Sequence, residues 1–450
     1  VTEDTLAEAS DNIESGKIVD KISAAQREAL TAYDGKYYSL PFIENTVGIT
    51  YDADLFTSKS YYLKGKTDGS WTGSSASDIG KAYFTNNKSD MTVGPNGIRG
   101  DYDDGLPATI EEYKALVARI HSTGDAPFIW SGRNAWYATF LGYSAWASLS
   151  GIDEAMLSFN YGTGSGKDVQ LEYVSEFNGE TPQFATSVVT PETGYLTHKS
   201  KSLYYASELM RYVFSNNDFR AQKWSTVNTQ LMTQREYIYS NLTGSNQAIA
   251  MLLDGNWWYN EATESKSFED SLKRGGSLDR NFKFMPMPIK VDGGVKEGEG
   301  SNPTLPTMGS LNCFINNNIT NPGIVKAAKT FVKFVYTDEN LSTIQEKCGG
   351  KVGVNYVLPP EKYSKLNTFA KSYADIVKVS DNVVTASAAP IFVNNSKEMM
   401  DPRTWLFNTT VSSVVCGPLD AFKTYKYSTK VYFEGLDKQD TWASKYSKWF

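Results

Sequence analysis

The sequence predicts an α/β protein built from two or three domains, or from two lobes that share the chain. Its 450 residues exceed what one ordinary hydrophobic core organises. Amphipathic helical stretches alternate with short β-prone runs along the chain. Hydrophobic residues make up 40% and charged residues 21%, as is typical of globular proteins.

The first predicted elements lie within the first fifty residues. Residues 20–33 read as a short helix, which the Asp34-Gly35 turn ends. Two β-prone runs follow, at 37–41 and 46–51, and the tetrad between them ends in Glu44 and Asn45. Those two polar side chains are candidate ligand contacts.

Residues 57–106 are rich in Gly, Ser, Asn and Asp without periodicity, which favours a long surface insertion. Within it, Asp101, Asp103 and Asp104 precede Gly105 and could offer oxygens to calcium. The calcium-loop pattern lacks its final glutamate and its alternate spacing, so the sequence favours a solvated turn there.

A clear helix follows. Thr109 and Glu112 have the spacing of a capping box, and an apolar stripe runs from Tyr113 to Ile120 before Gly124 ends the helix. The stretches 203–213 and 324–336 show the same periodicity and are predicted to face the core, the latter through Ala327, Ala328, Phe331, Phe334 and Val335. Runs at 282–284 and 311–315 are predicted strands.

Composition excludes several function classes. The formal net charge of -7 and the pI near 5.2 argue against a nucleic-acid partner, because phosphate binding needs a basic surface. No apolar run is long enough to cross a bilayer. The three cysteines, Cys313, Cys348 and Cys416, indicate small buried side chains rather than a disulfide framework.

Catalytic motifs are equally scarce. The two histidines, His121 and His198, are too few and too far apart for a His-rich zinc site, and no serine-nucleophile elbow is present. Residues 162–168 resemble a phosphate loop only superficially, because their spacing is broken. A pair of carboxylates for glycoside hydrolysis stays possible, with Glu44 and Asp254 as the best pair.

The strongest signals suit sugar binding. The chain has 28 Tyr and 10 Trp, and Trp257 and Trp258 directly follow an apolar run and a turn that contains Asp254. A pyranose has an apolar C–H face and a polar rim, so its recognition needs aromatic platforms with Asp, Glu or Asn beside them. Trp130 and Trp136, near Arg133 and Asn134, repeat this combination.

Several motifs then occur in the order found in one family: residues 33–41 (YDGKYYSLP), 48–56 (GITYDADLF), 250–258 (AMLLDGNWW), 285–288 (MPMP), 307–310 (TMGS) and 327–341 (AAKTFVKFVYTDENL). With them, the chain resembles the extracellular sugar-type solute-binding proteins of ATP-driven (ABC) importers, the group that includes maltose-binding protein. Each motif alone is weak, and their order over most of the chain is specific.

The resemblance implies a two-lobed periplasmic-binding-protein-like fold whose lobes are discontinuous in sequence and joined by a hinge. One lobe would comprise 1–45 and 286–358, the other 46–285 and 359–450, with crossings near Asn45, Pro286 and Leu358. Family members carry a further strand-helix-strand segment before the YDGKYYSLP motif, so the first lobe is expected to be incomplete in this chain or to be built differently.

The resemblance also suggests ligand contacts. Trp257 resembles the family's sugar-stacking Trp, Trp136 matches an aromatic on the same lobe, and Glu44, Asn45 and Thr46 fall in the polar segment of the hinge strand. The remaining candidates are Asp254, Trp258, Trp405, Ser310 and Asn134. For the tryptophans the alternative is packing alone, and for Ser310 it is a hydrogen bond to its own loop.

The expected function is therefore an extracellular receptor, a lipoprotein or a periplasmic protein, that binds an oligosaccharide by lobe closure and passes it to an ABC permease. The resemblance implies no cofactor, no metal and no catalysis, and we expect a monomer. Two alternatives stay open: a glycan-cleaving enzyme that uses Glu44 and Asp254, and a cell-surface interaction protein that has kept the fold and lost transport.

Overall fold

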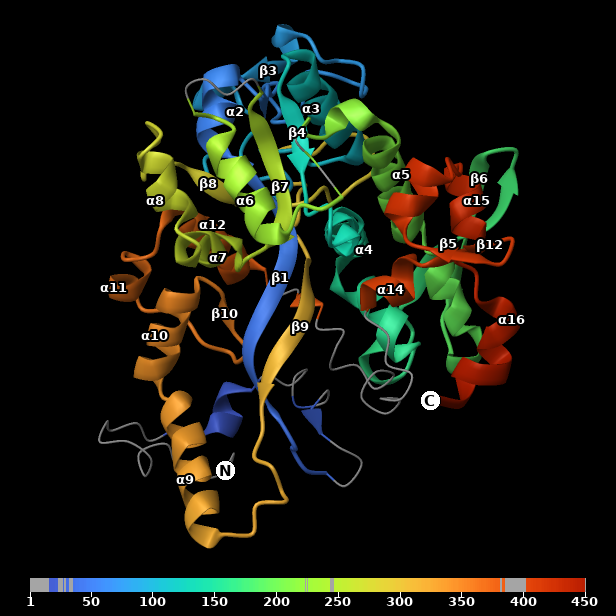
Figure 1. Ribbon diagram of the computed structural model, residues 1–450. Helices are drawn as coiled ribbons and strands as arrows, with labels where there is room; N and C mark the ends of the chain where they lie inside the picture. Colours follow the sequence, from blue (N-terminus) through green and yellow to red (C-terminus); the bar gives the residue numbers. More distant parts are fainter. Residues whose placement is uncertain are drawn as a thin grey trace.

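One long strand, β1 (Leu40–Asp52), organises the computed structural model (Figure 1). The structure describes residues 16–22, 27, 30–31, 35–222, 224, 226–242, 247–380, 383–384 and 402–449. The predicted helix 20–33 therefore lies mostly outside the described residues: a 3-10 turn, η2 (Ile18–Lys21), overlaps its start, and Arg27 and Leu30 are helical. Strand β1 begins at Leu40, so it includes the predicted strand 46–51 but only the last two residues of the predicted strand 37–41. The tetrad between them belongs to the same strand, because it is itself paired with neighbouring strands.

Strand β1 takes part in two sets of strand pairs. Its first half, Leu40 to Thr46, pairs antiparallel with β9 (Leu305–Cys313), and Ile43 and Glu44 also pair with β10 (Lys351–Val352). Its second half pairs antiparallel with β7 (Ile249–Gly255) and β8 (Phe282–Met285). The resulting strand order is β11 (Val383–Val384), β9, β1, β7 and β4 (Ala126–Ile129). A single strand thus runs from one half of the molecule into the other.

We call the part around β4, β7 and β8 the larger lobe. Its helices are α2 (Ala53–Lys59), α3 (Ile110–Ser122), α4 (Thr139–Asn160), α5 (Lys201–Ser215), α6 (Gln230–Tyr239), α7 (Trp258–Glu264), α8 (Ser267–Leu272), α12 (Thr368–Val379), α14 (Pro402–Phe407), α15 (Thr429–Glu434) and α16 (Gln439–Thr441). Its outlying strand pairs are β2 (Tyr62–Leu63) with β3 (Phe84–Thr85), β5 (Gln170–Asn178) with β6 (Thr181–Val188), and β12 (Thr409–Val411) with β13 (Val414–Cys416). Two large hydrophobic clusters fill this lobe among the described residues.

The predicted helix after Thr109 is confirmed as α3. The Thr109 hydroxyl accepts from the Glu112 backbone N–H at 3.1 Å, and the Glu112 carboxylate accepts from the Thr109 N–H at 3.1 Å, which completes the capping box. Tyr113, Leu116, Val117 and Ile120 are buried as predicted. Beyond the helix, Gly124 has a φ of +89°, the left-handed conformation that glycine adopts without strain.

The stretch 57–106 is more than a surface insertion. It contributes β2, β3 and the buried side chains of Tyr61, Leu63 and Trp71 to the larger hydrophobic cluster. Asp103, predicted in a solvated turn, is 0% exposed, and its carboxylate accepts from the Asn96 backbone N–H at 3.0 Å. Sparse apolar residues at irregular spacing therefore still form a core once they pack against α3.

We call the other part the smaller lobe: the first half of β1 with β9, β10, α9 (Pro322–Val335) and α10 (Asp338–Cys348). Its hydrophobic cluster is formed by Ile18, Ile22, Leu40, Val332, Tyr336, Leu341, Val352 and Val354. The short helix α11 (Pro360–Tyr363) follows and contacts α10. The smaller lobe thus has one modest core among the described residues.

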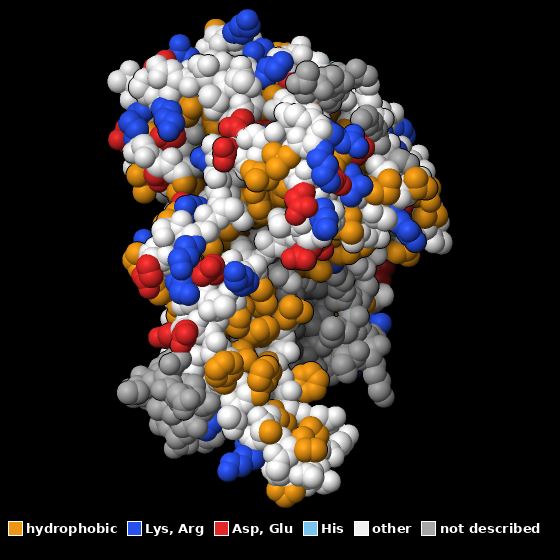
Figure 2. Space-filling view, turned by 60° about the vertical axis from the view of Figure 1, so that its left-hand side comes forward, with side chains coloured by type: hydrophobic (Ala, Val, Ile, Leu, Met, Phe, Trp, Pro, Cys, Tyr) orange, Lys and Arg blue, Asp and Glu red, His pale blue; other side chains and the backbone are white. Residues whose placement is uncertain are grey.

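Helix α9 corrects the predicted orientation of the stretch 324–336. Val332 and Tyr336 are buried, whereas Phe331 is 63% exposed and Ala327 and Phe334 are also exposed. A groove of about 560 Å³ runs along this uncovered side, and Figure 2 shows apolar side chains gathered at this end of the molecule. The helix has apolar residues on two sides, and the small cluster covers only one of them.

Two further findings concern membranes and cysteines. No helix in the described part of the chain is long and apolar enough to span a bilayer. The three cysteines are free, and only Cys416 is buried as predicted, since Cys313 and Cys348 are partly exposed.

Candidate functional site

The candidate site lies at the carboxyl end of β7. This strand is buried along its whole length, with β1 antiparallel on one side and β4 parallel on the other. It ends at Asp254-Gly255, opposite Gly48 and Val47 of β1. A Cβ on Gly255 would come within 2.1 Å of the Trp257 indole, so this glycine lets the ring fold back over the end of the strand.

Aromatic side chains form one part of the site. Trp257 is partly buried, and its ring meets Phe140 of α4 edge to face, with 6.3 Å between centroids. Tyr137 of the 3-10 turn η5 (Ala135–Ala138) interacts with the Trp257 side chain through its hydroxyl. Burial, and then the nearby acids Asp254 and Glu261, raise the pKa of Tyr137, so its hydroxyl keeps its proton.

Trp136 lies beside this group and is 40% exposed. Its ring centroid is 4.8 Å from that of Tyr137 and 5.5 Å from that of Phe140. The Arg403 guanidinium of α14 stacks on the ring, 4.0 Å from its centroid. Arg403 therefore fixes the orientation of an aromatic ring that stays accessible to solvent.

Buried polar groups form the other part. The Gln234 amide of α6 donates to Asp254 at 3.0 Å and to Glu261 at 2.7 Å, and so joins the two acids. The Gly255 N–H donates to the second Asp254 oxygen at 2.8 Å. Burial raises the pKa of Asp254 to about 8 and also raises the pKa of Glu261. Burial thus favours the neutral, protonated form of Asp254.

The predicted hinge residues lie where β1 passes between the lobes. The Glu44 carboxylate is buried and pairs with the Lys351 ammonium of β10 at 2.8 Å. The Thr46 hydroxyl bonds to the Tyr373 hydroxyl at 2.7 Å, and its backbone bonds twice to Asn256. Asn45 is partly buried beside a bulge in the ladder, and its side chain has no hydrogen-bond partner within the described residues. Of the three, Asn45 is thus the one with free hydrogen-bonding capacity.

Of the remaining predicted site residues, some lie beside the aromatic group and others lie elsewhere in the molecule. Asn134 lies just before η5 and donates to Gln230 of α6 at 3.3 Å, beside the aromatic group. Ser310 pairs opposite Glu44 in the ladder, and its side chain is not among the described parts. Trp258 and Trp405 are both fully buried in cores, where Trp258 packs on Phe282 and Phe369 and Trp405 donates to the Tyr161 hydroxyl.

Sequence reasoning missed Tyr137, Phe140, Gln234, Glu261 and Arg403. The neighbourhood of Trp136 could have indicated Tyr137, and the first turn of the helix after Trp257 could have indicated Glu261. Nothing in the sequence pairs Gln234 with Asp254 or Arg403 with Trp136, because these contacts join separate segments.

Comparison with known proteins defines the fold. No protein-family model matches the chain, and no curated protein sequence matches it. Among solved structures, it is similar to SBP RafE in complex with raffinose, with 14% identity over 95% of this chain and 77% of that one, at a TM-score of 0.52. It is also similar to a chitin oligosaccharide binding protein, with 13% identity over 94% of this chain and 76% of that one, at a TM-score of 0.50. The predicted two-lobed α/β solute-binding fold is confirmed.

Proposed function

We propose that this protein is an extracellular receptor that captures a neutral oligosaccharide between its two lobes without changing it chemically. The observation that carries the proposal is the pairing of Trp257 and Trp136 with the buried Asp254, Gln234 and Glu261 at the end of β7. These residues lie beside the strand that joins the lobes.

The chemistry of this group suits a sugar. Indole faces can cover the apolar C–H face of a pyranose, and amide and carboxyl groups can bind the hydroxyl rim. Burial raises the pKa of Asp254 to about 8 and so favours its neutral form, which presents no charge to attract a cation. A neutral ligand with many hydroxyls fits such a site.

The fold supports the same ligand class. By their descriptions, one similar structure holds raffinose and the other is of a protein that binds chitin oligosaccharides. Both ligands are oligosaccharides. We therefore favour an oligosaccharide over a peptide, a polyamine or a sugar phosphate.

The proposed mechanism is lobe closure. A ligand that contacts both lobes stabilises the closed state over the open one, so its affinity is a difference between two conformations. Polar contacts already cross between the lobes, since the Asn260 amide of α7 donates to the Lys347 carbonyl of α10 at 3.0 Å. We propose that the closed, monomeric receptor then docks on an ABC permease at the membrane.

The glycan-cleaving alternative is disfavoured by the placement of its two acids. Asp254 pairs with Gly48, four residues along β1 from Glu44, which corresponds to about 13 Å of strand. Glycosidase carboxyls lie about 5 to 9.5 Å apart. Glu44 is also held by Lys351. We therefore propose a binding protein rather than an enzyme.

The test is a calorimetric and thermal-shift screen of the protein against mono- and oligosaccharides, raffinose and chitin oligosaccharides included. We expect a saturable isotherm with at least one oligosaccharide and a higher melting temperature, because a ligand of the folded state stabilises it by mass action. Trp257→Ala and Trp136→Ala should each weaken binding by about tenfold or more, which corresponds to about 1.4 kcal/mol.

Tyr425→Ala is the matched control, because Tyr425 is 45% exposed but belongs to the segment after β13 and not to the site. Normal sugar binding by both Trp variants would remove the proposed site, and a protein that binds none of the sugars would support the interaction-protein alternative. Release of reducing sugar by the wild type, lost in Glu44→Gln, would establish the enzyme instead.

A further inference from the structure

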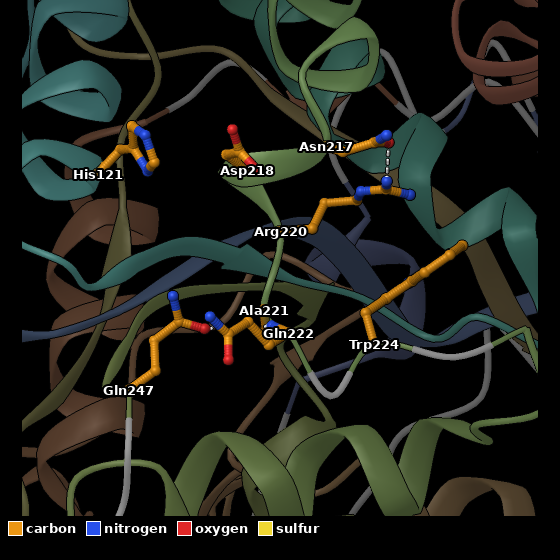
Figure 3. A pocket seen from close by; sticks show the side chains of 8 residues that line it. All are labelled: His121, Asn217, Asp218, Arg220, Ala221, Gln222, Trp224 and Gln247. Atoms are coloured by element: carbon orange, nitrogen blue, oxygen red, sulfur yellow. Dashed lines mark hydrogen bonds between the residues drawn. The ribbon is translucent and has the colours of Figure 1, made fainter.

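A second cavity, of about 220 Å³, lies at the opposite end of the larger lobe (Figure 3). Gln247, which precedes β7, lines this cavity, whereas Trp257 follows the same strand. The seven residues of β7 span about 23 Å, so the cavity is well separated from the proposed sugar site. The lining residues are His121, Asn217, Asp218, Arg220, Ala221, Gln222, Trp224 and Gln247.

Arg220 is the distinctive group of this cavity. It is only 9% exposed, and its Nη2 donates to the Asn217 side chain (Figure 3). Its Nε and Nη1 have no hydrogen-bond partner, and no carboxylate of the described residues lies within ion-pair distance of it. A buried cation without a counter-ion is costly, so such a group is normally paired.

The neighbouring groups show what kind of partner would fit. The guanidinium lies over the Trp224 ring, 4.7 Å from its centroid, and the indole N–H of Trp224 is also buried with no partner in the described part of the chain. The unsatisfied atoms of Arg220 and Trp224 are therefore all donors. A ligand that satisfies them must bring acceptor oxygens, and a negative charge would neutralise the guanidinium.

The other nearby charges limit the charge of that ligand. The Lys423 ammonium lies over the same Trp224 ring, 3.9 Å from its centroid. Burial and, to a smaller extent, the positive charge of Arg220 lower the pKa of Lys423. Asp218 lies on the exposed rim and would repel an anion. Two cations, Arg220 and Lys423, and one carboxylate, Asp218, leave a net charge of +1 at the cavity, so a monoanion is favoured over a dianion such as phosphate.

We propose that this cavity binds a small monocarboxylate whose carboxylate group is held by Arg220. The planar guanidinium fork matches a planar carboxylate, and the apolar body of the ligand would lie against Ala221 and the Trp224 ring. A volume of about 220 Å³ is below the range of about 300 to 1,000 Å³ for drug-sized ligands, which favours a small organic acid over an oligosaccharide.

The test uses calorimetry and thermal shift on the full chain with acetate, lactate and benzoate, against succinate and inorganic phosphate, at constant ionic strength set with sodium chloride. We expect at least one monocarboxylate to bind saturably and to raise the melting temperature. Arg220→Gln should weaken that binding by about tenfold or more, because hydrogen bonds to charged groups are strong.

Arg274→Gln is the matched control: Arg274 is an exposed arginine that also stacks on an aromatic ring, 4.8 Å from the Tyr239 centroid. It should bind the acid like the wild type. Arg220→Lys keeps the charge without the planar fork, and it should bind more weakly than the wild type. Circular dichroism establishes that each variant is folded.

Three outcomes would overturn the proposal. These are no binding of any monocarboxylate by the wild type, undiminished binding by a folded Arg220→Gln, or tighter binding of phosphate or succinate than of every monocarboxylate.

Discussion

The two lobes share a strand but differ in how they are held together. In the larger lobe, β7 is buried between β1 and β4, and two aromatic-rich clusters surround it. The described residues of the smaller lobe bury one modest cluster, and one side of α9 faces solvent (Figures 1 and 2). A continuous strand therefore does not by itself distribute stability evenly, because stability follows the apolar area that each lobe buries.

The lobes differ in their buried acids as well. The described carboxyl groups whose pKa is raised all belong to the larger lobe, where burial is the first cause: Asp52, Asp103, Asp104, Glu112, Glu154, Asp254 and Glu261. In the smaller lobe, Lys21 pairs with Asp338 and Lys351 with Glu44. The larger lobe thus contains both the larger hydrophobic core and the carboxyl groups whose ionised form is disfavoured by burial.

The largest expected effect comes from the core of the larger lobe. Trp258 is fully buried among Tyr237, Phe282 and Phe369, so Trp258→Ala should lower the free energy of unfolding of this lobe by about 3–5 kcal/mol. Leu341→Ala, in the smaller cluster, should cost about 2–5 kcal/mol there. Urea denaturation with hydrogen exchange separates the two lobes.

We expect Trp258→Ala to accelerate exchange in β7 and α12 more than in α9 and α10. Equal acceleration in both sets of elements would mean that the lobes unfold as one unit, and the proposed difference in stability between them would be wrong.

The next effect concerns pH. The pKa of Asp254 is about 8 in the folded protein and about 3.9 in an unfolded chain, so between these values the folded state holds a proton that the unfolded state has lost. Stability should therefore fall as the pH rises through this window, by up to about 1.4 kcal/mol per pH unit for this group.

Asp254→Asn removes the titration and keeps the shape, so its unfolding free energy should depend less on pH between 5 and 8 than that of the wild type. Glu269→Gln, an exposed change on α8, is the control and should leave the wild-type slope unchanged. Urea denaturation at several pH values measures the slopes. If Asp254→Asn and the wild type have the same slope, Asp254 is not protonated in the folded state.

Local chemistry explains what the sequence predicted well. The Thr109–Glu112 capping box involves residues three apart, and β7 with the following Asp254-Gly255 turn is one continuous pattern. These features place Trp257 at the end of a strand without any knowledge of the fold. Two of the aromatic residues of the candidate site, Trp257 and Trp136, were therefore accessible from the sequence, whereas Tyr137 and Phe140 were not.

The sequence did not predict in the same way which of the tryptophans are buried. Trp257, Trp258 and Trp405 all occur near polar residues or turns, yet Trp257 is only partly buried at the proposed site and the other two are buried in cores. The contacts of Gln234 with Asp254 and of Arg403 with Trp136 depend on how separate segments pack. Such contacts are tertiary and leave no local signal.

The crossing points between lobes stay predictions. The predicted crossing near Asn45 is favoured by the change of strand partners along β1 between Thr46 and Val47. For the second crossing, predicted near Pro286, backbone hydrogen bonds tie residues 289–301 to the larger lobe. We therefore favour a crossing closer to Leu305, where β9 begins.

The smallest expected effect tests the exposed side of α9. Phe331 is 63% exposed and its neighbour Val332 is buried against the smaller cluster, so the two adjacent positions face different environments. Phe331→Ser should change the free energy of unfolding by no more than about 0.5 kcal/mol, because surface substitutions have small effects. The substitution should also reduce binding of the apolar dye ANS, because it makes the exposed apolar patch on α9 smaller.

Val332→Ser is the matched control and should lower the free energy of unfolding by more than about 1 kcal/mol, because it places a hydroxyl in the core. Equal losses of stability at both positions would mean that Phe331 is covered in solution, and the contrast between the two lobes would be smaller than the structure indicates.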